Sequence, residues 1–274
     1  MYFQYYNFTE NPFNITADPH YFFSSSNHTE ALAHLVYGIE QRKGILILTG
    51  EIGTGKTTLC RTLINQLDEN YKTALILNPN FSDVQLLQII LKDFGVNTPT
   101  RSKYLLSEAL NQLLLDETGK GRNVVLIIDE AQNLSVRQLE QVRLLSNLET
   151  EKEKLLQIIL VGQPELCDKL KLNALRQLNQ RISVRYHIMP LDRDELNAYI
   201  SHRLNKASVP TGVTHEIPPQ FSPRAIDAIY KLSVGTPRMI NILCDRALLA
   251  GYIQETRTID ENIIHKCARE VGQK

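Results

Sequence analysis

The chain has 274 residues, which is enough to bury one large core and a smaller companion. Its 30 basic and 30 acidic residues cancel, so the overall charge gives no support for a nucleic-acid or membrane partner. The four cysteines lie far apart, as expected for reduced thiols in the cytosol, and no apolar run approaches the roughly 20 residues that span a bilayer. The N-terminus lacks the basic region and apolar core of a signal peptide.

The first 40 residues combine aromatic side chains with turn-forming pairs. The prolines of Asn11-Pro12 and Asp18-Pro19 favour turns, and the aromatic rings favour burial. Apolar residues then recur at helical spacing over residues 29–39, which predicts a helix there.

The strongest motif in the chain is a glycine-rich loop between an expected strand at 45–48 and an expected helix at 58–67. The loop reads G-x-x-x-x-G-K-T, the spacing of a Walker A phosphate loop. We expect it to bind ATP through Gly50, Glu51, Ile52, Gly53, Thr54, Gly55, Lys56, Thr57 and Thr58.

Each part of this loop has a physical role. Glycines let backbone N–H groups converge on phosphate oxygens, and the start of the helix adds partial positive charge. Lys56 is expected to reach the β- and γ-phosphates, and the hydroxyl of Thr57 to bind Mg²⁺. The alternative is a glycine turn that matches by chance. The N-terminal aromatic residues then have two equally suitable roles, to cover the adenine ring or to form a packing arm.

Strands and helices alternate over the next part of the chain, with helices expected at 83–94, 103–117 and 135–148. Apolar strands lie between and after them, which predicts a parallel sheet covered on both faces. We therefore predict an α/β fold, a P-loop NTPase with a parallel five-stranded αβα sandwich over residues 1–190. Its further strands are expected at 73–77, 123–128, 157–161 and 184–189.

Two carboxylates follow the strand at 123–128 and resemble a Walker B element. The carboxyl ends of parallel strands are where α/β sheets bind their ligands. Asp129 is expected to hold Mg²⁺, and Glu130 to polarise the attacking water. The alternative is an acidic turn between a strand and a helix.

Polar residues also end two neighbouring strands. Gln163 is expected to touch the γ-phosphate or to orient the water. Asn78 is expected to hydrogen-bond Glu130 and to restrain it until a partner arrives. Because Gln163 precedes Pro164 and Asn78 precedes Pro79, each also suits a simple turn.

Three arginines lie just before or within the last strand: Arg176, Arg181 and Arg185. An arginine supplied by a neighbouring subunit would neutralise charge on the transferring phosphoryl group, an effect of about 10³–10⁵ in rate. Arg181 is the first choice for this arginine finger, before Arg185 and Arg176. The alternative is a set of surface ion pairs.

After Pro190 the strands end, and helices are expected at 192–208, from 222, at 237–252 and at 259–271, with a linker at 209–219. Residues 191–274 are therefore predicted to form a small all-helical lid domain. Arg238 opens one helix and is expected to reach the γ-phosphate; the alternative is that it faces solvent. The histidines have no zinc spacing, no serine stands in a G-x-S-x-G elbow, and no aromatic set is interleaved with basic residues.

Taken together, these motifs resemble AAA+ ATPases, and more closely the ExeA/GspA type of secretion ATPase. The resemblance covers nearly the whole chain and is carried by residues 11–13, 18–19, 30–35, 49–61, 129–134, 161–166, 175–181 and 235–247. It implies Mg²⁺-dependent ATP hydrolysis in a homo-oligomer that drives or gates assembly of type II secretion, pilus or polysaccharide-export machinery. It also implies an inner-membrane or envelope partner protein and a cytoplasmic location, with peripheral attachment through that partner.

One departure and two alternatives accompany this resemblance. Longer members of the family add a transmembrane helix and a periplasmic peptidoglycan-binding domain, whereas this sequence ends at Lys274 with neither. Similar ATPase cores occur in regulators of DNA transposition and target selection, so nucleic acid stays open as a partner. A nucleotide-gated switch with little turnover of its own is the other alternative.

Overall fold

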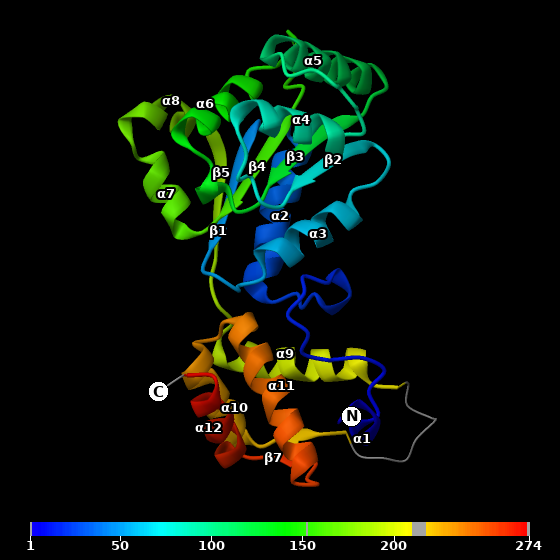
Figure 1. Cartoon of the computed structure of the whole chain (residues 1–274), viewed down its shortest axis with the longest axis vertical. Coiled ribbons are helices and arrows are strands. Elements are labelled where there is room, and N and C mark those ends of the chain that lie inside the picture. The colour runs from blue at the N-terminus through cyan, green and yellow to red at the C-terminus, as the bar shows by residue number, and fades with distance from the viewer. Residues whose placement is uncertain (1, 152, 210–217, 273–274) are drawn as a thin grey trace. The chain divides into compact units, whose positions relative to one another are not determined.

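The computed structural model describes residues 2–151, 153–209 and 218–272, which fall into two compact units (Figure 1). The sheet unit comprises Ser26–Glu51 and Lys56–Ile188. The helical unit comprises Met1–Ser25, Ile52–Gly55 and Met189–Lys274. Most of the linker expected at 209–219 lies outside the described residues.

The sheet unit is built on five parallel strands in the order β2-β3-β4-β1-β5, which confirms the predicted sheet. The three inner strands are buried at every residue because helices cover both faces. The edge strand β5 instead alternates between partly buried and exposed residues until its last position. The strands are β1 (Ile45–Gly50), β2 (Tyr71–Ile76), β3 (Asn123–Ile128), β4 (Gln157–Gly162) and β5 (Ile182–Ile188).

Helices cover the two faces unequally (Figure 1). The pair α2 (Ser26–Glu40) and α3 (Lys56–Gln66) packs together against β1 on one face. The other face carries the larger core cluster, to which the remaining helices contribute. These are α4 (Asp83–Asp93), α5 (Lys103–Gly119), α6 (Val136–Leu145), α7 (Pro164–Leu170) and α8 (Arg176–Gln180), together with the 3₁₀ turns η2 (Ala131–Asn133) and η3 (Asn173–Leu175).

Local sequence explains where the longer helices begin. Capping boxes start α4, from Ser82 and Gln85, and α6, from Ser135 and Gln138, as the polar residues before these apolar runs suggest. The short helices α7 and α8 were not predicted. They have 7 and 5 residues, which is too few for an apolar period to show in the sequence.

The helical unit buries its own core among four longer helices. Its elements are α1 (Tyr2–Tyr6), η1 (Pro19–Tyr21), α9 (Arg193–Ala207), β6 (Gln220–Phe221), α10 (Pro223–Ser233), α11 (Pro237–Ile253), β7 (Thr258–Ile259) and α12 (Glu261–Glu270). The prediction that no strand follows Pro190 is wrong in one detail, because β6 and β7 form a short parallel pair. Each has only two residues, so no alternation was visible in the sequence.

The N-terminal segment differs from expectation, because Met1–Ser25 groups with the helical unit and not with the sheet unit. Buried aromatic rings explain this placement: Tyr2, Tyr6, Phe8, Phe13 and Tyr21 all belong to the helical core. Of the two roles considered for these aromatic residues, the structure therefore supports the packing arm.

A buried arginine ties this arm to α9. Arg203 donates hydrogen bonds to the backbone oxygens of Pro12 at 2.5 Å and Asn14 at 3.0 Å. Its guanidinium also lies 4.6 Å from the ring centre of Tyr21 and donates to the hydroxyl of Tyr199. Backbone oxygens and aromatic faces thus solvate a charge that is 6% exposed.

Within the described residues, no helix is both long enough and apolar enough to cross a bilayer.

Candidate active site

The phosphate loop lies between the end of β1 at Gly50 and the start of α3 at Lys56. Gly53 and Gly55 have φ values of 83° and 94°, which side-chain-bearing residues rarely adopt, so the motif's glycines are needed where they stand. Thr54 is fully buried. The sequence thus folds locally into the strand, loop and helix that the motif requires.

Lys56 is buried at the base of this loop. Its ammonium donates to the backbone oxygens of Gly50 at 2.8 Å and Glu51 at 2.9 Å. Burial lowers the pKa of Lys56, while the nearby carboxylates of Glu130 and Asp129 act in the opposite direction. A buried cation in this position is suited to an anionic ligand such as a phosphate group.

Thr57 and Asp129 meet directly. The hydroxyl of Thr57 donates to Oδ2 of Asp129 at 2.5 Å, which joins the first turn of α3 to the end of β3. Asp129 is 2% exposed, and burial raises its pKa, although hydrogen bonds from Thr57 and from the N–H of Glu130 oppose this effect. A hydroxyl and a carboxylate are hard oxygen donors of the kind Mg²⁺ prefers, so these two residues fit that ion.

Such a site is not an all-protein metal cage. No group of three or more histidine, cysteine, aspartate or glutamate side chains suited to a metal occurs in the described part of the chain. Mg²⁺ is usually held by one or two protein ligands together with waters and substrate phosphates, which is the composition that Thr57 and Asp129 allow.

Glu130 stands at the end of the sheet in an unusual backbone conformation. Its φ of 52° and ψ of 37° are left-handed, and it precedes the 3₁₀ turn η2. Its Oε2 accepts hydrogen bonds from the side-chain amides of Gln132 and Gln163, the latter at 3.2 Å. The structure therefore brings the expected Glu130 and Gln163 together, and it adds Gln132, which the sequence analysis had not singled out.

Asn78 does not join this cluster. Its side chain is exposed, and no hydrogen bond links it to Glu130 in the described part of the chain. The topology gives the reason, because β3 lies between β2 and β4, and the carboxylate of Glu130 is hydrogen-bonded on the β4 side. The expected hydrogen bond between Asn78 and Glu130 is therefore not what the structure has; the side-chain amides of Gln132 and Gln163 donate to this carboxylate instead.

The three candidate arginines lie before or within β5, whereas Glu130 follows the carboxyl end of β3. Arg176 is the first residue of α8, Arg181 follows its last residue and precedes β5, and Arg185 lies within β5. All three are exposed. Arg181 donates to the side-chain oxygen of Asn147, and Arg185 donates to Asn179 at 2.6 and 3.0 Å. Among the described residues, none of the three forms a direct ion pair with a carboxylate, although Arg181, after Lys154, helps to lower the pKa of Glu149.

Arg238 is the second residue of α11, and its side chain is exposed. Its backbone N–H donates to the carbonyl of Gly53 at 3.2 Å, a contact within the helical unit, to which Ile52–Gly55 belongs. A Cβ at Gly53 would lie 2.6 Å from the Cβ of Arg238, so this loop position also needs a glycine for space.

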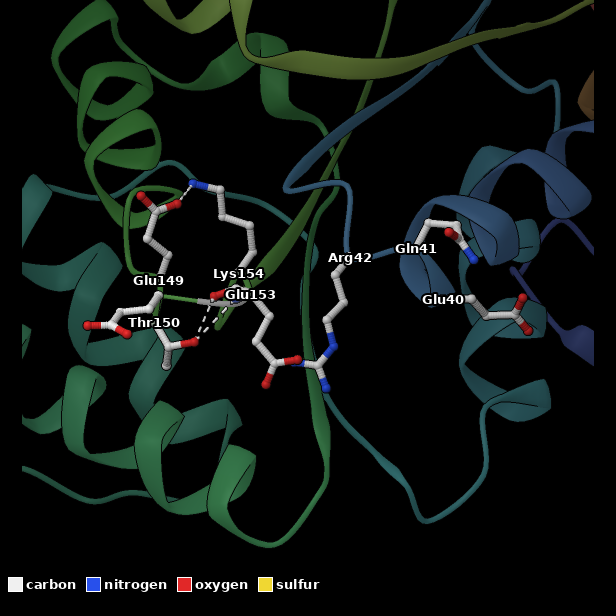
Figure 2. Close-up of a pocket in the computed structure, with 8 residues that line it drawn as sticks. Glu40, Gln41, Arg42, Glu149, Thr150, Glu153 and Lys154 are labelled. Carbon is white, nitrogen blue, oxygen red and sulfur yellow. Dashed lines mark hydrogen bonds and ion pairs between the residues drawn. The ribbon is translucent and has the colours of Figure 1, made fainter.

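A hollow of about 680 Å³ lies elsewhere on the sheet unit (Figure 2). It is lined by Glu40 at the end of α2, by the following Gln41 and Arg42, and by five residues that precede β4: Glu149, Thr150, Glu151, Glu153 and Lys154. Figure 2 shows the side chains of Arg42 and Glu153 pointing toward each other. Nη1 of Arg42 lies 3.0 Å from Oε2 of Glu153, and Lys154 pairs with Glu149. The hollow adjoins the amino ends of the strands, so it holds none of the residues expected to contact ATP.

The comparisons with known proteins agree with this geometry. Residues 39–170 match the family model described as "AAA domain". The structure resembles the ORC2 protein of Aeropyrum pernix in ADPNP-ADP complexes, with a TM-score of 0.69 and 17% identity over 96% of this chain and 72% of that one. It also resembles Cdc6p of Pyrobaculum aerophilum, with a TM-score of 0.68 and 16% identity over 93% of this chain and 71% of that one. The chain therefore has the AAA P-loop NTPase fold.

A comparison of sequences gives a more specific similarity. The chain is 42% identical over 273 residues to General secretion pathway protein A of Aeromonas hydrophila, a match that covers 99% of this chain. It spans about half the length of that curated relative, 49%. The chain is thus similar to General secretion pathway protein A over nearly its whole length, which confirms the GspA/ExeA resemblance expected from the motifs.

Proposed function

We propose that this chain is an ATPase that binds ATP with Mg²⁺ and hydrolyses it to drive or gate the assembly of a cell-envelope machine. The contact between Thr57 and Asp129, beside the buried ammonium of Lys56, carries the proposal. It gathers a metal-binding hydroxyl, a metal-binding carboxylate and a phosphate-binding cation at one point of the sheet unit. The match to General secretion pathway protein A supports the link to the envelope.

The residues would divide the chemistry among them. Lys56 and the loop N–H groups bind the phosphates, and Thr57 and Asp129 hold Mg²⁺, which neutralises negative charge on the phosphoryl group when bound. Glu130 accepts a proton from the attacking water. Gln163 contacts Glu130 at 3.2 Å, so its role is to orient the carboxylate or the water beside it.

An arginine from a second copy of the chain is part of the proposal. Arg181 lies before the amino end of β5, whereas Glu130 follows the carboxyl end of β3, so Arg181 is not placed to serve the site of its own chain. It is exposed, as are the runners-up Arg185 and Arg176. Arginine suits this task because its planar guanidinium stays charged and grips oxygens in pairs. A homo-oligomer with a shared site follows from the proposal, and Arg238 would report on the γ-phosphate.

The partner of this ATPase is proposed from its relative. Because the chain spans about half of General secretion pathway protein A, the partner and the location of the whole relative are carried over only as proposals. We propose action on the cytoplasmic side of the inner membrane, through a membrane or envelope partner protein. Genes for a secretin, a pilin or polysaccharide export beside this one would support that assignment, and a transposase gene would support the DNA-linked alternative.

Turnover assays test the proposal. Purified protein should hydrolyse ATP only when Mg²⁺ is present, and its specific activity should rise with protein concentration because the site is shared. Lys56→Ala should lose both ATP binding and hydrolysis. Arg181→Ala should bind ATP normally and lose about 10³–10⁵ in rate. Activity that is independent of concentration and unaffected by Arg181→Ala would contradict the shared site.

The same assay separates the alternatives. Wild-type turnover at the level of Lys56→Ala, with ATP binding intact, would favour a nucleotide-gated switch. A regulator of DNA transposition would instead show DNA affinity that falls steeply with salt, because phosphate contacts release counterions. The balanced overall charge of the chain gives no support for such binding.

A further inference from the structure

Gln132 connects three parts of the candidate active site. Its side-chain Nε2 donates to Oε2 of Glu130, and its Oε1 accepts the backbone N–H of Gln163 at 3.1 Å. Its backbone oxygen accepts from the ammonium of Lys169, which also donates to the backbone oxygen of Leu134 at 2.9 Å. One glutamine therefore links η2, the end of β4 and α7.

The orientation of this amide is fixed by its partners. A backbone N–H can only donate, so the atom of Gln132 that faces the N–H of Gln163 must be the oxygen. The nitrogen then faces the carboxylate of Glu130, which can only accept when ionised. The approach to β4 is close, because a Cβ at Gly162 would lie 2.8 Å from Oε1 of Gln132.

Both glutamine amides donate to the same oxygen of Glu130. Gln132 and Gln163 share Oε2, and no hydrogen bond to Oε1 is found among the described residues. This arrangement holds one oxygen of the carboxylate and leaves the second oxygen without a hydrogen bond from the described residues. Glu130 also has a left-handed backbone conformation, which persists only where surrounding contacts hold it.

We propose that Gln132 is a positioning residue for Glu130. It holds the carboxylate by Oε2 so that Oε1 accepts the proton of the attacking water. Lys169 supports it by anchoring its backbone oxygen from α7. This inference rests on the proposed ATPase function and adds to it a residue that acts through Glu130 without contacting the nucleotide.

Substitution of Gln132 by methionine tests the inference. Gln132→Met keeps the length of the side chain and removes both hydrogen bonds. We expect kcat to fall about tenfold or more, since a misplaced general base loses part of a contribution of about 10²–10⁴. KM and the equilibrium Kd for a fluorescent ATP analogue should change less than twofold, a split that general loss of folding would not produce. Gln112→Met, at an exposed position of α5, is the matched control.

A double variant shows whether the effect passes through Glu130. In a Glu130→Gln background, adding Gln132→Met should change the residual rate less than twofold. Lys169→Met should lower kcat by a smaller factor, and it is the second variant if Gln132→Met does not fold. Wild-type or higher kcat in the folded Gln132→Met protein, or an equal loss in both backgrounds, would overturn the inference alone. Wild-type turnover no higher than that of Lys56→Ala would overturn the proposed hydrolysis and the inference together.

Discussion

The two ends of the central strands carry polar residues in very different ways. At the carboxyl ends, Asp129 and Lys56 are almost fully buried. Asp129 accepts a hydrogen bond from Thr57 of α3, and Lys56 donates one to the backbone oxygen of Gly50 in β1. At the amino ends, the hollow of Glu40–Arg42 and Glu149–Lys154 holds ion pairs that remain partly open to solvent. Charges held away from water interact strongly and change their pKa, whereas screened surface pairs contribute little.

The buried groups at the carboxyl ends of the strands belong to the candidate active site, whereas the partly exposed ion pairs at the amino ends do not. Next to this buried pair, the partly exposed Glu130 has a left-handed backbone conformation, a strained feature that persists where surrounding contacts hold it. The hollow is large, but its charges are matched with one another. Substitutions of the same kind at the two ends therefore test the contrast directly.

The largest effect is expected from Glu130→Gln. Loss of the carboxylate removes the proton acceptor, so kcat should fall about 10²–10⁴-fold while ATP binding persists. Glu149→Gln, at the hollow, is the matched change and should leave kcat within twofold of wild type. Steady-state ATP hydrolysis with a parallel binding titration measures both. Equal losses in the two variants would remove the contrast between the two ends.

A stability gain is expected from Asp129→Asn. Burial raises the pKa of Asp129, so the ionised carboxylate is disfavoured in the folded state. Its destabilising effect is absent below the unfolded-state pKa of about 3.9 and is fully present above the folded-state pKa. At pH 7.5 the variant should gain about 0.5–2 kcal/mol, since the asparagine amide keeps both contacts by accepting from the N–H of Glu130 and donating to the hydroxyl oxygen of Thr57. It should also lose Mg²⁺-dependent turnover.

Denaturant unfolding at several pH values checks this sign, and the gain should shrink as the pH falls toward the folded-state pKa. Asp168→Asn is the control, because Asp168 is an exposed residue paired with Lys171. A neutral-pH stability of Asp129→Asn below that of wild type would show that the hydrogen bonds to the carboxylate outweigh its burial.

The smallest effect is expected from Glu153→Gln in the hollow. Its pair with Arg42 is only partly shielded, so the free energy of unfolding should change by about 0–1 kcal/mol. ATP hydrolysis should be unchanged, because the hollow lies at the amino ends of the strands. Thermal unfolding and turnover of the same sample provide the measurement, and a loss of activity would show that the hollow communicates with the nucleotide site.

The sequence predicts those parts of the molecule whose signals are local. The three inner strands are largely apolar runs, and the phosphate loop lies between a strand and a helix, so fold class and loop follow from neighbouring residues. Asp129 and Glu130 were predictable for the same reason, because they directly follow β3.

Many contacts within the site join residues that are far apart in the sequence, so the sequence alone did not predict them. Asn78 and Gln163 both end strands, and only the position of β3 between β2 and β4, with the turn after Glu130, decides that Gln163 makes the contact. Gln132 had a weak local signal, as an amide two residues after Glu130, but its bond to the N–H of Gln163 spans 31 residues. The arm around Arg203 was hidden for the same reason, since Pro12 and Arg203 are 191 residues apart.

The placement of this arm has a consequence for how the chain is divided. The helical unit takes most of its residues from both ends of the sequence. The chain runs through the sheet unit from Ser26 to Ile188, apart from Ile52–Gly55 of the phosphate loop, which groups with the helical unit. In sequence, the sheet unit is therefore inserted between the two terminal parts of the helical unit. A fragment that begins at residue 191 would lack Tyr6 and Phe13 from its core, so cutting the chain at that point cannot yield the complete helical unit.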